Sequence, residues 1–262
     1  MLLIDDLNVY FGSAHVLKDV SLTAMPGAVT CIVGPNGSGK TTTLRAATGD
    51  IAYEGSITLN GHSLKRLENW EAARLRAVLP QASTLAFPFT VIEVVRIGLQ
   101  TGEAGDQDNI AIEALAKVDL ATYANRSYHE LSGGEQQRVQ LARVLAQIPD
   151  AKPDDDPRWL FLDEPVASLD IAHQLEVMTI ARNFADAGGG VVAVMHDLNL
   201  TAMFADQIVL MSEGKVLADG RPDAVMTDDT LSRAYRCDLR VSCPPSDNQP
   251  FLLPHAARAA AE

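Results

Sequence analysis

Eight residues in the first fifth of the chain have the pattern of a phosphate-binding loop. GPNGSGKT, residues 34–41, satisfies G-x-x-x-x-G-K-[ST], and it lies between the apolar run AVTCIV at 28–33 and the helix-compatible TTTLRAATG. The glycines let backbone N–H groups converge on one anion, and a helix N-terminus adds partial positive charge. We expect Lys40 to reach β- and γ-phosphates and Thr41 to ligate Mg²⁺. The alternative is a glycine-rich turn with an exposed lysine.

An acidic pair at the end of another apolar run could complete this site. In WLFLDE, residues 159–164, Asp163 ends the run and could hold Mg²⁺ directly or through water. Glu164 would emerge on the other side of the strand, where it could orient an attacking water or accept its proton. The alternative is a solvated strand exit. Beside the phosphate loop, the pair predicts a nucleoside triphosphatase.

A third motif, LSGGEQQR at 131–138, opens the helix-compatible VQLARVLAQI with two glycines. Each glycine costs about 1 kcal/mol relative to alanine inside a helix. Ser132 and Glu135 have the spacing of a capping box, which explains the serine and the glutamate but leaves Gly133 and Gly134 unexplained. Bare backbone at a helix N-terminus is suited to a second anion.

These motifs lie on elements that predict an α/β architecture. The apolar runs at 159–163 and 191–196 predict buried strands, and residues 171–187 between them predict a helix. Continuous apolar strands that alternate with helices indicate a parallel sheet covered on both faces.

Other segments predict smaller elements around this sheet. Residues 9–22 and 55–61 are typical of short strands with turns, and residues 82–150 are mainly helical in pattern. A polar, proline-broken loop is expected at 146–158, and two short helices at 220–236.

The composition limits the classes of function. The 262 residues are 47% apolar, and the net charge of −13 argues against a free nucleic-acid-binding protein, which usually has a basic face. No run of 18 or more apolar residues occurs, so we expect no membrane-spanning segment. The acidic N-terminus lacks the basic region of a signal peptide. The three cysteines, Cys31, Cys237 and Cys243, are expected to be free thiols.

The order of the motifs resembles that of the ATP-binding-cassette (ABC) ATPases. LSGGEQQR is similar to the family's signature motif, and GPNGSGKTT and LFLDEP stand before and after it. Gln81 in VLPQ resembles the Q-loop glutamine, ASLD at 167–170 the D-loop, and His196 in VMHDLN the switch histidine. Phe11 stands where the family stacks an aromatic ring on adenine, and the neighbouring Tyr10 is the other candidate.

The resemblance covers about residues 2–240 and implies a fold. We expect a P-loop NTPase with a mostly parallel core sheet, an N-terminal antiparallel β subdomain and an inserted α-helical subdomain. The ATPase domain would span 1–242, with the helical subdomain at approximately 82–150, and a tail would span 243–262. Val166 departs from the threonine most common in the family, but that position is not a nucleotide ligand there.

The resemblance also implies the site, because in the family two cassettes pack head to tail around each nucleotide. The implied ATP-binding residues are Phe11, Gly34, Pro35, Asn36, Gly37, Ser38, Gly39, Lys40, Thr41 and Thr42. The implied catalytic residues are Lys40, Gln81, Glu164 and His196, and the implied Mg²⁺ ligands are Thr41, Gln81 and Asp163. The residues implied to contact the partner's ATP are Ser132, Gly133, Gly134, Glu135 and Asp170.

Within the family, the chain resembles the separate ATPase subunits of bacterial importers for iron chelates, haem and cobalamin, and most of all the haem importer ATPases. This likeness rests on HDLN, on the ending GRPDAVMT…LSRAY, on LAFPFTVIEVVRIGL after Gln81 and on the insertion before RWLFLDEP. It implies a homodimer at the cytoplasmic face of the inner membrane, bound to a permease dimer. An extracytoplasmic haem-binding protein would be an indirect partner, without nucleic acid and without direct contact to the cargo.

Several other classes fit less well. Ferric-siderophore or cobalamin import is the alternative for the cargo. Chromosome-structure and DNA-repair ATPases place long coiled-coil arms between the two motifs, whereas only residues 41–131, 91 in number, separate Lys40 from Ser132. Tandem translation-type ATPases have two cassettes, and an exporter would usually carry a fused membrane domain. A cassette that binds ATP without hydrolysis is opposed by Lys40, Asp163, Glu164 and His196.

Overall fold

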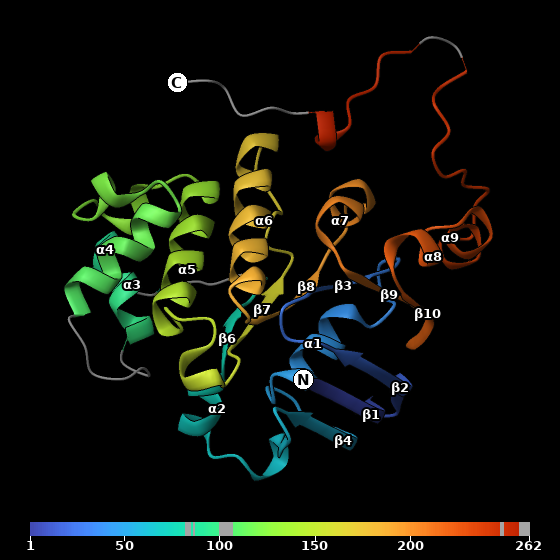
Figure 1. Cartoon of the computed structure of the whole chain (residues 1–262), viewed down its shortest axis with the longest axis horizontal. Helices are drawn as coiled ribbons and strands as arrows, with labels where there is room; N and C mark the ends of the chain where they lie inside the picture. Colours follow the sequence, from blue (N-terminus) through green and yellow to red (C-terminus); the bar gives the residue numbers. More distant parts are fainter. Residues whose placement is uncertain (82–84, 86, 100–106, 247–248, 257–262) are drawn as a thin grey trace.

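The chain folds around two β-sheets that flank the helix after the phosphate loop. The computed structural model describes residues 1–81, 85, 87–99, 107–246 and 249–256. Helix α1 (Lys40–Ala47) contacts β2 of one sheet and β7 and β8 of the other, so it lies between them (Figure 1).

The larger sheet is mostly parallel and carries the site. Its strand order is β10-β9-β3-β8-β7-β6, and all neighbouring pairs are parallel except β9 and β10. The strands are β3 (Val29–Val33), β6 (Arg76–Leu79), β7 (Trp159–Asp163), β8 (Gly190–Val194), β9 (Gln207–Ser212) and β10 (Lys215–Gly220). Every residue of β3, β7 and β8 is buried, as expected for strands covered on both faces. The predicted buried strands at 159–163 and 191–196 are therefore confirmed, the second with its limits at 190–194.

The smaller sheet is antiparallel, in the order β2-β1-β4-β5. Its strands are β1 (Leu2–Phe11), β2 (Ala14–Ala24), β4 (Glu54–Leu59) and β5 (His62–Ser63). The expectation of short strands at 9–22 is wrong, because β1 and β2 have 10 and 11 residues. Register shifts, with Asp6 and Asp19 at positive φ, interrupt the alternation of buried and exposed side chains and so conceal this length.

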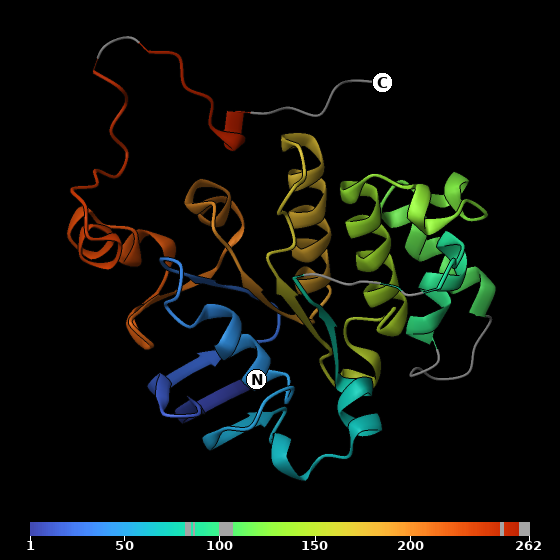
Figure 2. The ribbon, with the colours of Figure 1, turned by 180° about the vertical axis from the view of Figure 1, so that it is seen from behind.

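Helices cover one side of the large sheet and extend past its edge strand β6 (Figures 1 and 2). A group of α3 (Val91–Leu99), α4 (Gln107–Lys117) and α5 (Gly133–Gln147) packs together, and α5 also contacts β6. The remaining helices are α2 (Asn69–Leu75), α6 (Ile171–Asp186), α7 (Leu198–Phe204), α8 (Pro222–Val225) and α9 (Asp228–Tyr235). The two short helices predicted at 220–236 are confirmed. Within the described residues, no helix is long and apolar enough to span a membrane.

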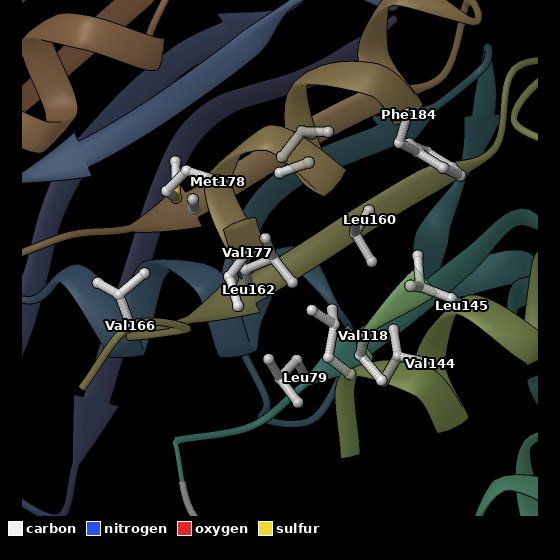
Figure 3. Packing of buried hydrophobic residues seen from close by; sticks show 14 of the residues in the cluster. Leu79, Val118, Val144, Leu145, Leu160, Leu162, Val166, Val177, Met178 and Phe184 are labelled. Atoms are coloured by element: carbon white, nitrogen blue, oxygen red, sulfur yellow. The ribbon is translucent and has the colours of Figure 1, made fainter. Parts of the chain in front are cut away.

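Two hydrophobic cores hold these layers together. One lies between the large sheet and the helices, where side chains of β7, α5 and α6 such as Leu160, Val144 and Val177 meet (Figure 3). The other lies between the two sheets around Trp159 and Phe161. Trp159 Nε1 also donates a hydrogen bond to Asn60 Oδ1 at 2.9 Å, which ties the antiparallel sheet to β7.

The expected fold class is confirmed: a mostly parallel core sheet, an N-terminal antiparallel sheet and a helical group between the phosphate loop and β7. The domain limits at 242 and at 82–150 remain predictions, and residues 82–84, 86 and 100–106 of the helical span lie outside the described residues. After α9 the chain leaves the body of the fold and returns to α7 with a 3₁₀ turn at Pro254–Ala256 (Figure 1). Cys31 is buried and Cys237 and Cys243 are exposed, and all three are free thiols, as expected.

Candidate functional site

The phosphate loop connects the carboxyl end of β3 to the N-terminus of α1. Gly34 has φ 145°, and a Cβ atom there would lie 2.1 Å from the carbonyl oxygen of Met211, so no larger residue fits. Gly39, with φ 102°, caps α1 without any side-chain hydrogen bond, and the first turn of α1 carries no acidic residue. The loop therefore presents backbone N–H groups and a helix N-terminus to an anion, as the motif predicts.

Lys40 is held by the loop itself. Its ammonium donates hydrogen bonds to the carbonyl oxygens of Gly34 and Pro35, at 2.9 and 3.1 Å. Burial lowers the pKa of Lys40, and the charges of Glu164 and Asp163 partly oppose that shift. The ammonium that the sequence predicts to reach phosphates therefore donates to two backbone carbonyl oxygens.

Thr41 and Asp163 meet on the side of the loop that faces β7. Thr41 Oγ1 donates a hydrogen bond to Asp163 Oδ1 at 3.1 Å, and Asp163 is only 4% exposed. Burial raises the pKa of Asp163, although the bond from Thr41 opposes the shift. A hydroxyl and a carboxylate in contact are the hard oxygen donors that Mg²⁺ prefers, so these residues fit that cation. Among the described residues, no group of three or more His, Cys, Asp or Glu could hold a metal ion.

Glu164 follows β7 directly and has an unusual backbone conformation. Its φ is 53°, which is uncommon for a residue other than glycine, and its N–H donates to the carbonyl of Val194 at 3.1 Å. The amide of Gln81 donates to Glu164 Oε2 at 2.9 Å, and Nε2 of His196 lies 2.6 Å from Oε1. Residues far apart in sequence thus converge on one carboxylate.

These groups line one cavity of about 470 Å³. A cavity of this volume is in the range of small-molecule and cofactor sites. Its lining residues are Asn36, Gly37, Gly39, Lys40, Thr41, Thr42, Gln81, Glu164 and His196. The cavity therefore brings together an anion-binding loop, a lysine and a carboxylate held by an amide and an imidazole.

Other predicted nucleotide contacts, Gly34, Pro35, Ser38 and Phe11, are not among the lining residues of this cavity. Pro35 and Ser38 line a second cavity of about 250 Å³, with Tyr235 and Arg236 from the region of α9. Phe11 lies at the end of β1 and is 52% exposed.

Tyr10 and Phe11 differ in their surroundings. The ring of Tyr10 stacks on His15, with centroids 4.2 Å apart and planes 15° apart. No ring contact involves Phe11 among the described residues. Within the described part of the chain, Tyr10 thus has an aromatic stacking partner and Phe11 has none.

The signature residues form the tip of α5 and do not line the nucleotide cavity of their own chain. Ser132 Oγ accepts from the N–H of Glu135 at 3.3 Å, and the Glu135 carboxylate accepts from the N–H of Ser132 at 2.8 Å, which confirms the capping box. A Cβ atom at Gly133 would meet no atom within 4 Å, so the fold of this chain does not require glycine there. Asp170, also outside the cavity, caps α6 through the N–H of His173 at 3.0 Å.

Gln137 is a residue of the site that the sequence analysis did not single out. Its amide donates to the carbonyl oxygens of Glu164 and Pro165, at 3.2 and 2.8 Å. The sequence offers one sign of this role: Gln137 belongs to LSGGEQQR but is not one of the apolar residues that form the buried stripe of the helix.

Comparisons with known proteins agree with this geometry. Residues 17–167, more than half of the chain, match the ABC transporter family. The Hemin import ATP-binding protein HmuV of Jannaschia sp. (strain CCS1) is 58% identical over 258 residues, which cover 98% of this chain and 96% of that protein. HmuV of Roseobacter denitrificans is 59% identical over 252 residues, which cover 96% of this chain and 97% of that protein.

Solved structures show the same fold at lower identity. A nucleotide-free ATP-binding cassette from an ABC transporter has a TM-score of 0.78 at 23% identity, covering 90% of this chain and 98% of that one. With the family match and the near full-length identity to the HmuV proteins, the chain belongs to the ABC transporter family and to its hemin import ATP-binding group.

Proposed function

We propose that this chain is the ATP-hydrolysing subunit of an importer that takes up haem through a separate permease. The observation that carries the proposal is the cavity in which the phosphate loop and Lys40 face the carboxylate of Glu164. The cargo is inferred from relatives of 58% and 59% identity that are named for hemin import.

In the proposed mechanism, ATP enters the cavity with its phosphates against the backbone N–H groups of the loop. Lys40 then leaves the carbonyl oxygens of Gly34 and Pro35 for the β- and γ-phosphates. This exchange is favourable because a hydrogen bond between two charged groups is stronger than one to a neutral carbonyl. Phe11 stacks on the adenine.

The proposed Mg²⁺ ligands of this chain are Thr41, Asp163 and the side-chain amide oxygen of Gln81. The ion, when bound, would neutralise charge that develops on the β- and γ-phosphate oxygens. The contact between Thr41 and Asp163 supports their shared role, because it already holds two oxygen donors together.

Glu164 is the proposed base that orients the attacking water and accepts its proton. Gln81 and His196 support this role because they hold both oxygens of its carboxylate toward the cavity. When the γ-phosphate arrives, His196 would turn to it and release one carboxylate oxygen for the water.

Two copies of the chain are proposed to enclose each nucleotide. Ser132, Gly133 and Gly134 of one copy, with Glu135 and Asp170, would contact the triphosphate bound to the other copy. The open backbone at Gly133 supports this arrangement, because it leaves room for an anion that the same chain does not supply.

The other partners follow from the proposed role. A permease dimer would anchor the two cassettes at the cytoplasmic face of the inner membrane, and an extracytoplasmic haem-binding protein would deliver the cargo. The chain would contact the permease and not the haem, and it would bind no nucleic acid.

Reconstitution tests this proposal. The permease is placed in lipid vesicles with the chain and ATP inside and the extracytoplasmic binding protein outside, and uptake of haem, a ferric siderophore and cobalamin is compared. We expect haem uptake that requires ATP and is lost in the Lys40→Ala variant. ATP-dependent uptake of only one of the other two cargoes would contradict the assignment of haem while leaving the ATPase role intact.

A further inference from the structure

One hydrogen-bonded side chain joins the signature helix to the backbone of the proposed catalytic base. Gln137 lies one turn into α5, and its amide donates to the carbonyl oxygens of Glu164 and Pro165, at 3.2 and 2.8 Å. Both bonds are partly buried. The Glu164 carbonyl also accepts from the N–H of Ala167 at 3.2 Å, so loss of the Gln137 amide would remove one of its donors as well as the donor to Pro165.

These bonds hold the peptide groups that follow Glu164 and Pro165, and so they help to orient the Glu164 carboxylate. The positive φ of Glu164 is a backbone conformation that a residue other than glycine keeps only when its surroundings hold it there. On one side its N–H is bonded to Val194, and on the other its carbonyl is bonded to Gln137. The carboxylate is thereby held where Gln81 and His196 reach it.

The other end of the connection is the tip of α5. Gly133 begins the helix, and four residues at 1.5 Å rise place Gln137 about 6 Å along its axis. The capping box of Ser132 and Glu135 makes this first turn a firm part of the helix. A shift or rotation of the tip must therefore move the Gln137 amide relative to the Glu164 carbonyl.

We propose that Gln137 is a positioning residue that couples the signature tip to the Glu164 of its own chain. In the proposed two-copy arrangement, on which this inference rests, the tip contacts one nucleotide while Glu164 acts on the other. Gln137 thus links the two nucleotide sites within a single chain. Engagement of the tip at one site sets the catalytic carboxylate at the second.

The same loop offers a matched control. Gln174 of α6 also donates through its amide to two carbonyl oxygens of the loop after β7, those of Val166 and Leu169, at 3.4 and 3.1 Å. Like Gln137, it is half-buried. It differs in that its helix does not carry the signature tip.

The test compares Gln137→Met with Gln174→Met in the complete transporter reconstituted in vesicles. Methionine keeps the length of the side chain and removes the donor. We expect Gln137→Met to lower kcat about tenfold, to change the KM for ATP less than twofold and to reduce the Hill coefficient for ATP toward 1. Gln174→Met should keep the Hill coefficient of the unmodified transporter and lose less than half of kcat. Melting temperatures verify that both variants are folded.

Two results would overturn the inference. One is an unchanged kcat and Hill coefficient in Gln137→Met, and the other is an equal loss of both quantities in Gln174→Met, which would indicate general weakening of the loop. If Gln137→Met does not fold, Gln137→Glu, which keeps shape and polarity but places a carboxylate against the two carbonyls, is expected to have the same effect. An unmodified transporter that hydrolyses no ATP would instead contradict the proposed function.

Discussion

The nucleotide cavity and the tip of α5 are both built on helix N-termini, but they differ in what surrounds them. In the cavity, the charged groups already have partners from the same chain: Lys40 binds two carbonyl oxygens, and Glu164 binds Gln81 and His196. At the tip of α5, the backbone at Gly133 faces open space. The contacts within the chain explain the residue types of the cavity, and they also crowd a Cβ atom at Gly134, which would lie 3.1 Å from Leu169 Cδ2. They do not explain Gly133, and this difference supports the proposal that its ligand comes from outside the chain.

The largest expected effect is that of a negative charge placed at Gly133, and it tests this comparison directly. A Cβ atom there meets nothing within 4 Å, so Gly133→Asp should fold normally. A carboxylate about 4 Å from the partner's γ-phosphate would cost about 4 kcal/mol at an effective dielectric constant of 20, which corresponds to about 10³-fold slower ATP hydrolysis.

Gly133→Asn is the matched control because it has the same shape without the charge. Steady-state ATPase assays of the complete transporter should show a much smaller loss for asparagine, and ATP binding to the phosphate loop should remain in both variants. Equal losses would indicate steric disturbance of the helix and remove the case for a triphosphate beside Gly133.

The second largest expected effect follows from removal of the proposed catalytic base, Glu164. Glu164→Gln should retain ATP binding and lower turnover by on the order of 10²-fold, about 3 kcal/mol of barrier. ATP-bound dimers should then accumulate in size-exclusion chromatography. Glu113→Gln, which changes an exposed glutamate of α4 that lines neither cavity, should leave turnover unchanged. Near-normal hydrolysis by Glu164→Gln would exclude Glu164 as the base.

A smaller effect distinguishes the two aromatic residues at the end of β1. Base stacking on an aromatic side chain contributes about 1–3 kcal/mol, so Phe11→Ala should weaken ATP binding about tenfold. Tyr10→Ala should weaken it less than about twofold, because its ring is stacked on His15. Isothermal titration calorimetry measures both dissociation constants. The reverse order would assign the adenine to Tyr10.

The smallest effect is on stability without nucleotide. Burial raises the pKa of Asp163 in the folded chain, so the folded state binds the proton more tightly than the unfolded state. Its contribution to stability is therefore lost as pH rises through the range between the unfolded and the raised folded pKa. Asp163→Asn should raise the melting temperature at neutral pH by on the order of 2 °C, and the difference should vanish in acid. A lower melting temperature at neutral pH would contradict this account.

Much of the site could be predicted from local patterns. The phosphate loop between strand and helix, the acidic end of β7 and the capping box of Ser132 each depend on a few neighbouring residues, and the structure contains all three. The parallel sheet followed from apolar runs alternating with helices. These features are local, so periodicity and spacing reveal them.

Other features depend on contacts that no local pattern contains. The bond from Gln137 to Glu164 joins residues 27 positions apart, and the chain between them gives no periodic sign of it. The length of β1 and β2 was missed because register shifts near Asp6 and Asp19 break the period-2 pattern while the pairing continues. The difference between Tyr10, which stacks on His15, and Phe11 likewise depends on the positions of the rings.

The phosphate loop offers an anion backbone dipoles and one lysine, whereas the chain as a whole has a net charge of −13. At long range the chain therefore repels ATP, and attraction begins only within the loop. Added salt screens the long-range repulsion more than the short contacts inside the cavity. Nucleotide association should accordingly become faster as ionic strength rises, and the phosphate released by hydrolysis is driven away by the same field.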